Sequence, residues 1–155
     1  MISAKKIIAG ILILNVWAQS EPSPPSSVTW PMMSELNIET GEASEALQSV
    51  NHQFVEVSGF IVPLEMDDMI DEVSDFLLVP DPMACIHVPP PPPNQMISVK
   101  MKAPIPLDMD YRGVAIQGQL SIVQADGIYT YELAGESAKD ANIEFDDPFL
   151  ELMGY

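Results

Sequence analysis

Cys85 and His87 have the residue types and the spacing of a metal-binding or nucleophilic site. In an extended segment, side chains two positions apart project to the same side, so both could face one ligand. A thiolate and an imidazole suit zinc or another borderline-soft metal ion, with carboxylates or water as further ligands. Asp67, Asp68 and Asp81 are carboxylates close to the pair in sequence. The sequence therefore predicts a metal site here.

Other interpretations of the pair stay open. Cys85 could be a buried small hydrophobic residue, with His87 hydrogen-bonded to the backbone. A catalytic thiol would need a lowered pKa and a third residue that orients the base, and the neighbouring acids favour the neutral thiol. His52 is expected in a solvated turn. Four methionines offer either an adaptable contact surface or soft ligands for Cu(I), namely Met66, Met69, Met83 and Met96.

The segment Pro89–Gln95, called the proline loop below, directly follows this pair. It consists of Pro89, Pro90, Pro91, Pro92, Pro93, Asn94 and Gln95. Five prolines form a polyproline II rod about 15 Å long, at ~3.1 Å per residue. One interpretation is a stiff connection that protects an edge strand. We favour a preformed contact surface for a protein partner, with the two amides supplying the polar contacts.

The elements that must position these residues are mainly β-strands. The expected strands are Gln53–Ile61, Asp75–Val79, Met96–Lys102, Val114–Ile122 and Tyr129–Leu133. The turn Ala125-Asp126-Gly127 joins the last two strands into a hairpin. Helical spacing of apolar residues predicts one amphipathic helix over Thr40–Val50, capped by Thr40. Gly59 and Gly118 lie in mid-strand, where a small barrel needs bulges or coiling.

Five short strands and one short N-terminal helix predict a mainly β fold. The expected architecture is a small, partly open five-stranded barrel that resembles the oligonucleotide/oligosaccharide-binding (OB) type, with a proline-rich loop between its second and third strands.

The charge of the chain restricts its partners. Its 155 residues include 23 Asp and Glu but only 6 Lys and Arg, which gives a net charge of −17. Such a chain repels nucleic acids and anionic lipid surfaces, and it favours cations and basic protein surfaces. A hydrophobic content of 47% excludes a wholly disordered chain, and the single cysteine excludes an internal disulfide.

The N-terminus has the three parts of a secretory signal. Two lysines precede an apolar stretch that is too short to span a membrane, and we expect cleavage after Ala18. Removal of the two lysines leaves 4 basic against 23 acidic residues and lowers the net charge from −17 to −19. The expected organisation is a signal peptide at 1–18, a flexible linker at 19–29, an OB-like barrel at 30–138 and an acidic tail at 139–155. We expect a periplasmic location without membrane insertion after cleavage.

Three sequence segments resemble the signature of a bacterial family of exported proteins catalogued as domain of unknown function 3299. The segments are Gly59–Glu65, Phe76–Pro80 and the Cys-x-His pair with its five prolines, Asn94 and Gln95. The similarity extends from about Trp30 to Ala138. It implies a periplasmic or lipid-anchored domain, often encoded beside a transporter ATPase and permease and in some cases within zinc-responsive gene clusters. It also adds Glu65 as a metal ligand.

The chain departs from that family at two places. It lacks the cleavage-site cysteine of lipid-anchored members, and Asp81-Pro82-Met83 replaces an aromatic-glycine turn before the cysteine. The signal peptide, the Cys-x-His pair, the proline loop and the family resemblance together predict a non-enzymatic periplasmic accessory module. This module would serve an ABC-type transporter linked to zinc homeostasis. It would carry a zinc site of Cys85, His87 and Glu65, and it would contact a transporter component through the proline loop. The alternatives are a soluble periplasmic metal chaperone or buffer, and a thiol-dependent enzyme.

Overall fold

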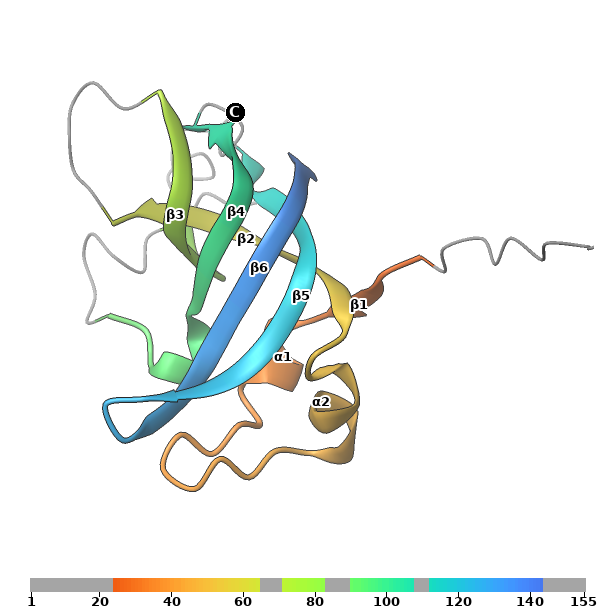
Figure 1. Cartoon of the computed structure of the whole chain (residues 1–155), viewed down its shortest axis with the longest axis vertical. Coiled ribbons are helices and arrows are strands. Elements are labelled where there is room, and N and C mark those ends of the chain that lie inside the picture. Colours follow the sequence, from red (N-terminus) through yellow and green to blue (C-terminus); the bar gives the residue numbers. More distant parts are fainter. Residues whose placement is uncertain (1–23, 65–70, 83–89, 108–111, 144–155) are drawn as a thin grey trace, which may run out of the picture.

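The computed structural model describes residues 24–64, 71–82, 90–107 and 112–143 (Figure 1). The elements are β1 (Ser26–Val28), α1 (Trp30–Met33), α2 (Glu45–Val50), β2 (Phe54–Pro63), β3 (Glu72–Val79), the 3-10 turn η2 (Pro93–Gln95), β4 (Ile97–Pro106), β5 (Val114–Ala125) and β6 (Ile128–Asp140). No helix in these ranges is both long and apolar enough to cross a membrane.

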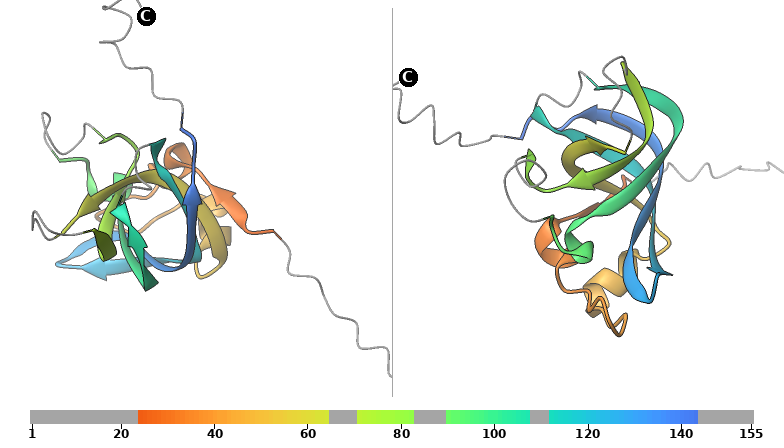
Figure 2. Two further views of the ribbon diagram at one scale, coloured as in Figure 1. Left: turned by 90° about the horizontal axis from the view of Figure 1, so that it is seen from above. Right: turned by 90° about the vertical axis from the view of Figure 1, so that its left-hand side faces the viewer.

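Strands β2 to β6 form a ring in the order β2-β3-β4-β6-β5, which returns to β2. The long strand β2 closes the ring because its first part, Phe54–Gly59, pairs with β5 and its second part, Phe60–Pro63, pairs with β3. Strand β6 lies between β4, to which it is parallel, and β5, to which it is antiparallel. Figure 2 shows the strands wrapped around a common centre. The predicted five-stranded, OB-like barrel is therefore confirmed.

Side chains that alternate along each strand fill the barrel. On β4, for example, Ile97, Val99 and Met101 are buried while the residues between them are exposed. Tyr131 and Phe76 are the largest fully buried side chains. This period of two is the pattern that predicts the strands, because successive side chains of a strand point to opposite faces.

The hairpin between β5 and β6 is also confirmed. Asp126 and Gly127 form its two-residue loop, and both have positive φ, 51° and 85°. Two positive φ values produce the turn whose twist matches that of the flanking strands. Further along the hairpin, the register shifts between Gln117 and Gly118, so the bulge expected at Gly118 is present. A side chain at this glycine would collide with the backbone of Ala134.

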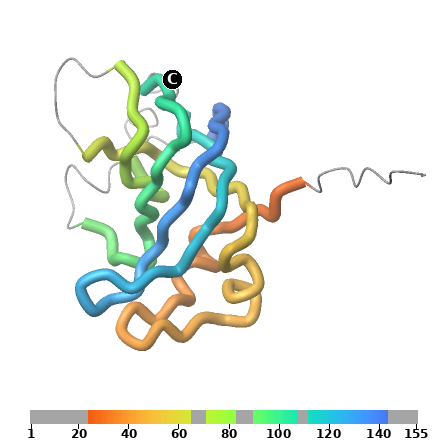
Figure 3. Tube along the Cα trace, in the orientation of Figure 1, coloured from red at the N-terminus to blue at the C-terminus, as the bar shows by residue number. Residues whose placement is uncertain are grey.

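The N-terminal segment closes one end of the barrel. Figure 3 shows α1, α2 and the chain between them gathered at the end where the β5–β6 hairpin turns. Their buried side chains, including Met33, Leu36 and Leu47, belong to the same core as Tyr131. The core therefore includes both the barrel and its helical cover.

Three predicted boundaries need correction. The helix begins at Glu45 and not at Thr40, because Asn37 holds residues 39–42 in a turn and the Ser44 hydroxyl caps the helix by accepting a hydrogen bond from the Leu47 N–H. The expected linker 19–29 contains β1, whose residues pair in parallel with Val55–Val57. Residues 139 and 140 belong to β6 and not to the tail. The predicted signal peptide at 1–18 and residues 144–155 lie outside the described residues.

Candidate contact site at the proline loop

The described part of the proline loop, residues 90–95, ends in the 3-10 turn η2. Pro92 has φ −64° and ψ 157°, the backbone conformation of polyproline II. Pro90 and Pro92 are exposed, while Pro91 is half-buried. The loop therefore presents stiff, apolar rings to the outside before it turns into the barrel.

Two amide side chains attach this turn to the helical cover. The Asn94 Nδ2 donates hydrogen bonds to the backbone oxygens of Ser34, at 3.1 Å, and Leu36, at 3.0 Å. The Gln95 Nε2 donates to the backbone oxygen of Trp30 at 3.1 Å. The Trp30 carbonyl belongs to α1 and also accepts the helix bond from the Ser34 N–H, while Ser34 and Leu36 lie just after the helix. The N–H groups of both side-chain amides therefore bind the protein's own backbone, and no residue that the structure describes donates a hydrogen bond to the Asn94 Oδ1 or the Gln95 Oε1.

The helix α1, which receives the bond from Gln95, is itself attached to the barrel. The Trp30 Nε1 donates a 2.7 Å hydrogen bond to the Ser58 carbonyl of β2, and the Tyr131 hydroxyl donates a 2.7 Å bond to the Met33 carbonyl. Burial, and then the negative charge of Glu35, raises the pKa of the Tyr131 phenol. The phenol therefore stays protonated and keeps its donor proton. The helix to which the end of the proline loop is bonded is therefore itself held to β2 and β6 by hydrogen bonds.

The predicted metal ligands Cys85, His87 and Glu65, together with Pro89, lie outside the described residues. Within the part of the chain that the structure describes, no three His, Cys, Asp or Glu side chains group as a metal site would require. His52 lies in the exposed turn before β2, as predicted, and its Nδ1 is 3.2 Å from the Ser121 hydroxyl. The metal site stays a prediction.

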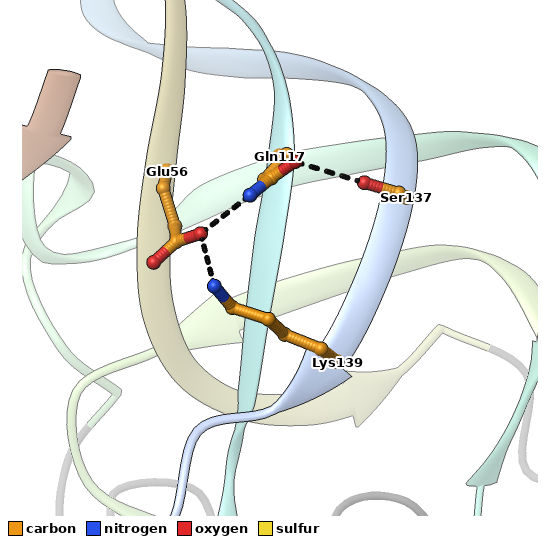
Figure 4. A network of polar contacts seen from close by, with 4 residues as sticks. All are labelled: Glu56, Gln117, Ser137 and Lys139. Carbon is orange, nitrogen blue, oxygen red and sulfur yellow. Dashed lines mark hydrogen bonds and ion pairs between the residues drawn. The ribbon is translucent and has the colours of Figure 1, made fainter. Parts of the chain in front are cut away.

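A polar network on the outer surface was missed by the sequence patterns (Figure 4). Its centre is the Glu56 Oε2, which accepts a 2.6 Å hydrogen bond from Gln117 and lies 2.7 Å from the Lys139 Nζ. The Ser137 hydroxyl donates to the Gln117 Oε1 at 3.2 Å. The Gln117 bond, followed by the bond from Lys139, lowers the pKa of Glu56.

This network connects strands β2, β5 and β6. Its members come from separate strands, so only the strand register brings them together. The one signal in the sequence is that each is a polar residue at an outward-facing strand position. The geometry is that of a cross-strand clamp, because the Glu56 carboxylate of β2 accepts bonds from side chains of β5 and β6.

The surface that OB barrels use for ligands has a different composition here. Such proteins bind oligonucleotides and oligosaccharides on the face of their second and third strands, and single strands of nucleic acid stack on aromatic side chains there. In this chain the corresponding strands are β3 and β4. Between positions 75 and 102 of these strands, the outward side chains are not aromatic: Asp75, Leu77, Ser98, Lys100 and Lys102. The barrel therefore supplies a fold but no stacking platform on this stretch.

Comparisons with known proteins agree on the family. The model of the family described as "Protein of unknown function (DUF3299)" matches residues 29–140. A similar solved structure is that of a DUF3299 family protein from Pseudomonas aeruginosa PAO1, with 24% sequence identity and a TM-score of 0.58. The alignment covers 79% of this chain and 100% of that one, and it supports the fold. A search of curated proteins gives no match. The matched range contains the whole barrel from α1 to β6, and the chain belongs to the DUF3299 family of proteins of unknown function.

Proposed function

We propose that this protein is a non-enzymatic binding module of the bacterial periplasm that contacts a transporter component through its proline loop. The observation that carries the proposal is the anchoring of the loop: Gln95 holds its end to α1 and Asn94 holds it to the segment after α1, while Pro90 and Pro92 stay exposed. A partner that binds a preformed polyproline segment does not have to order it, so less conformational entropy is lost on binding.

The charge of the chain supports a protein partner over nucleic acid or lipid. At −17, the protein repels phosphate groups and attracts basic protein surfaces. The connection to an ABC-type transporter and to zinc homeostasis rests on the family resemblance. Cys85, His87 and Glu65 are the proposed zinc ligands, since zinc binds thiolate, imidazole and carboxylate groups.

In vivo photo-crosslinking tests this proposal. A photo-reactive residue is placed at Pro90 in the loop, and a matched one at Asp126 in the exposed hairpin turn, which lies outside the proline loop. We expect the Pro90 position to form one discrete adduct with a transporter subunit, identified by mass spectrometry. The adduct should disappear when Pro91 and Pro92 are replaced by glycine, because the rod then loses its fixed shape.

Two results would overturn the proposal. One is an identical adduct pattern from Pro90 and Asp126, which would mean unspecific capture. The other is an adduct at Pro90 that persists after the glycine replacements, which would mean that the partner does not recognise the polyproline shape.

A further inference from the structure

A groove on the outside of the barrel lies away from the proline loop. It has a cavity volume of about 350 Å³, at the lower end of the ~300–1,000 Å³ typical of ligand clefts. It crosses strands β4, β6 and β5, and its lining residues are Lys100, Met101, Lys102, Gln119, Ala134, Gly135 and Glu136. Ala134, a small and exposed residue of β6, forms the floor between the longer side chains, and the Met101 side chain lies against the buried Gly135 beside it.

The groove lies where the strand ladders are interrupted. The pairing of the parallel strands β4 and β6 ends at Met101 and Gly135, although both strands continue beyond these residues (Figure 1). On β4, Lys100 pairs with Asp75 of β3 and the next paired residue is Ile105, which pairs with Val73, so the pairing is interrupted between them. On β6, the register with β5 skips Glu136. The two strands therefore present irregular backbone to the groove from both sides, as at bulges that end strand pairing.

The charges around the groove are unusual for this chain. Two of its six basic residues, Lys100 and Lys102, line one wall. Lys100 lies 3.8 Å from Asp75, with 81% of its side chain exposed, and an ion pair this exposed contributes little. Lys102 has no ion pair among the described residues. On a protein of net charge −17, this wall is a local attraction for negative groups.

The side chains of the opposite wall do not suit a simple inorganic anion as the ligand. Glu136 is a carboxylate that would repel a phosphate or sulfate, and the Gln119 side chain can both donate and accept hydrogen bonds. An extended peptide with acidic side chains satisfies both walls, because it carries carboxylates and also backbone N–H donors. Extended peptides commonly bind where a sheet leaves strand backbone available.

We infer that this groove binds an extended acidic segment of a partner protein. Its carboxylates contact Lys100 and Lys102, and its backbone N–H groups donate to Glu136 and Gln119. This surface is separate from the proline loop, so the protein can hold two segments of a partner, or two partners, at once.

An NMR titration of the full chain tests the inference. The probe is an eight-residue peptide of alternating Glu and Thr, with blocked ends and four negative charges. A peptide of alternating Glu and Pro has the same charge but lacks four of the backbone N–H groups. We expect the Glu-Thr peptide to shift the amide signals of Gly135, Glu136 and Lys102 and the side-chain signal of Gln119, and the Glu-Pro peptide to bind several-fold more weakly.

Two variants separate charge from shape. The Lys102→Gln substitution should weaken peptide binding about two- to five-fold at low salt, in line with one exposed ion pair, and the Arg112→Gln substitution is its control because it removes an exposed charge outside the groove. The Ala134→Leu substitution should fill the floor and weaken binding more than ten-fold without any change of charge, with Ala125→Leu as its control. Both Lys102 and Arg112 are exposed, so these variants should fold even if Ala134→Leu does not.

The inference is overturned if the peptide shifts no groove signals, if its shifts fall on the proline loop, or if Lys102→Gln and Arg112→Gln weaken binding equally. Equal binding of the Glu-Thr and Glu-Pro peptides, or a preference for tetragalacturonate of the same charge, would also overturn it, because the groove would then select charge or carbohydrate and not peptide backbone. Replacement of the loop prolines should leave peptide binding to the groove unchanged. The groove can therefore be tested independently of the proposed partner binding by the proline loop.

Discussion

Replacement of Asn94 by alanine should destabilise the protein by removing both hydrogen bonds that attach the proline loop to the segment after α1. Each ordinary hydrogen bond contributes about 0.5–1.5 kcal/mol to stability. The bond to Ser34 is exposed, so water can replace it at little cost. The bond to Leu36 is partly buried, and its loss leaves a carbonyl with poorer access to water. We therefore expect a loss of about 1.5 kcal/mol in the free energy of unfolding, of which most comes from Leu36.

The assay is urea unfolding followed by far-UV circular dichroism and by tryptophan fluorescence. Trp30 lies next to the altered contact, since its carbonyl accepts the bond from Gln95. The matched control is Gln124→Ala, which removes an exposed amide at the end of β5. It should change the free energy of unfolding by less than about 0.5 kcal/mol, as surface substitutions usually do. If Asn94→Ala and Gln124→Ala have equal stability, the anchoring role assigned to Asn94 is wrong.

Three further predictions concern the strand packing, the polar network and the metal site. Gly59→Ala should cost about 1–3 kcal/mol in urea unfolding, because a Cβ there would lie 2.6 Å from the Val79 carbonyl oxygen; an unchanged midpoint would contradict this. The pKa of Glu56 is lowered in the folded protein, so its contribution is present above the unfolded-state pKa and is lost as the pH falls through the folded-state pKa. In unfolding titrations between about pH 5 and pH 3, Glu56→Gln should therefore lose less stability on acidification than the wild type, and parallel curves would refute the assignment. Elemental analysis of the zinc-loaded protein should give one zinc ion per chain, lost in Cys85→Ala and kept in His52→Ala, and a metal-free wild type would end the metal hypothesis.

The local pattern of the sequence predicted the strands and the hairpin of the last two, but not the other strand pairings. Alternation of buried and exposed side chains marked β2, β4, β5 and β6, because that pattern follows from each strand alone. The parallel pairing of β4 with β6 depends on ring closure, which no local pattern contains. Strand β1 has only three residues in a segment rich in serine and proline, so pairing with β2 decides its conformation.

The candidate site was predictable in composition but not in its contacts. The residues of the proline loop were identified from their types and order. The acceptors for Asn94 lie 60 and 58 positions away in the sequence, and the acceptor for Gln95 lies 65 positions away. Their anchoring role therefore emerges only from the folded chain. The groove was missed for the same reason, since the interrupted registers that produce it are properties of strand pairs.

The position of β6 in the ring has a consequence for the order of folding. It comes last in sequence among the strands that the structure describes, yet it lies between β4 and β5 and pairs with both. Until about residue 140 is available, the β4 and β5 edges cannot be bridged, so a growing chain holds at most an open sheet. Contacts of this long sequence separation make barrels fold slowly compared with helical proteins. Closure of the barrel is therefore a late, all-or-none event, and a truncation within β6 should abolish the fold instead of shortening it.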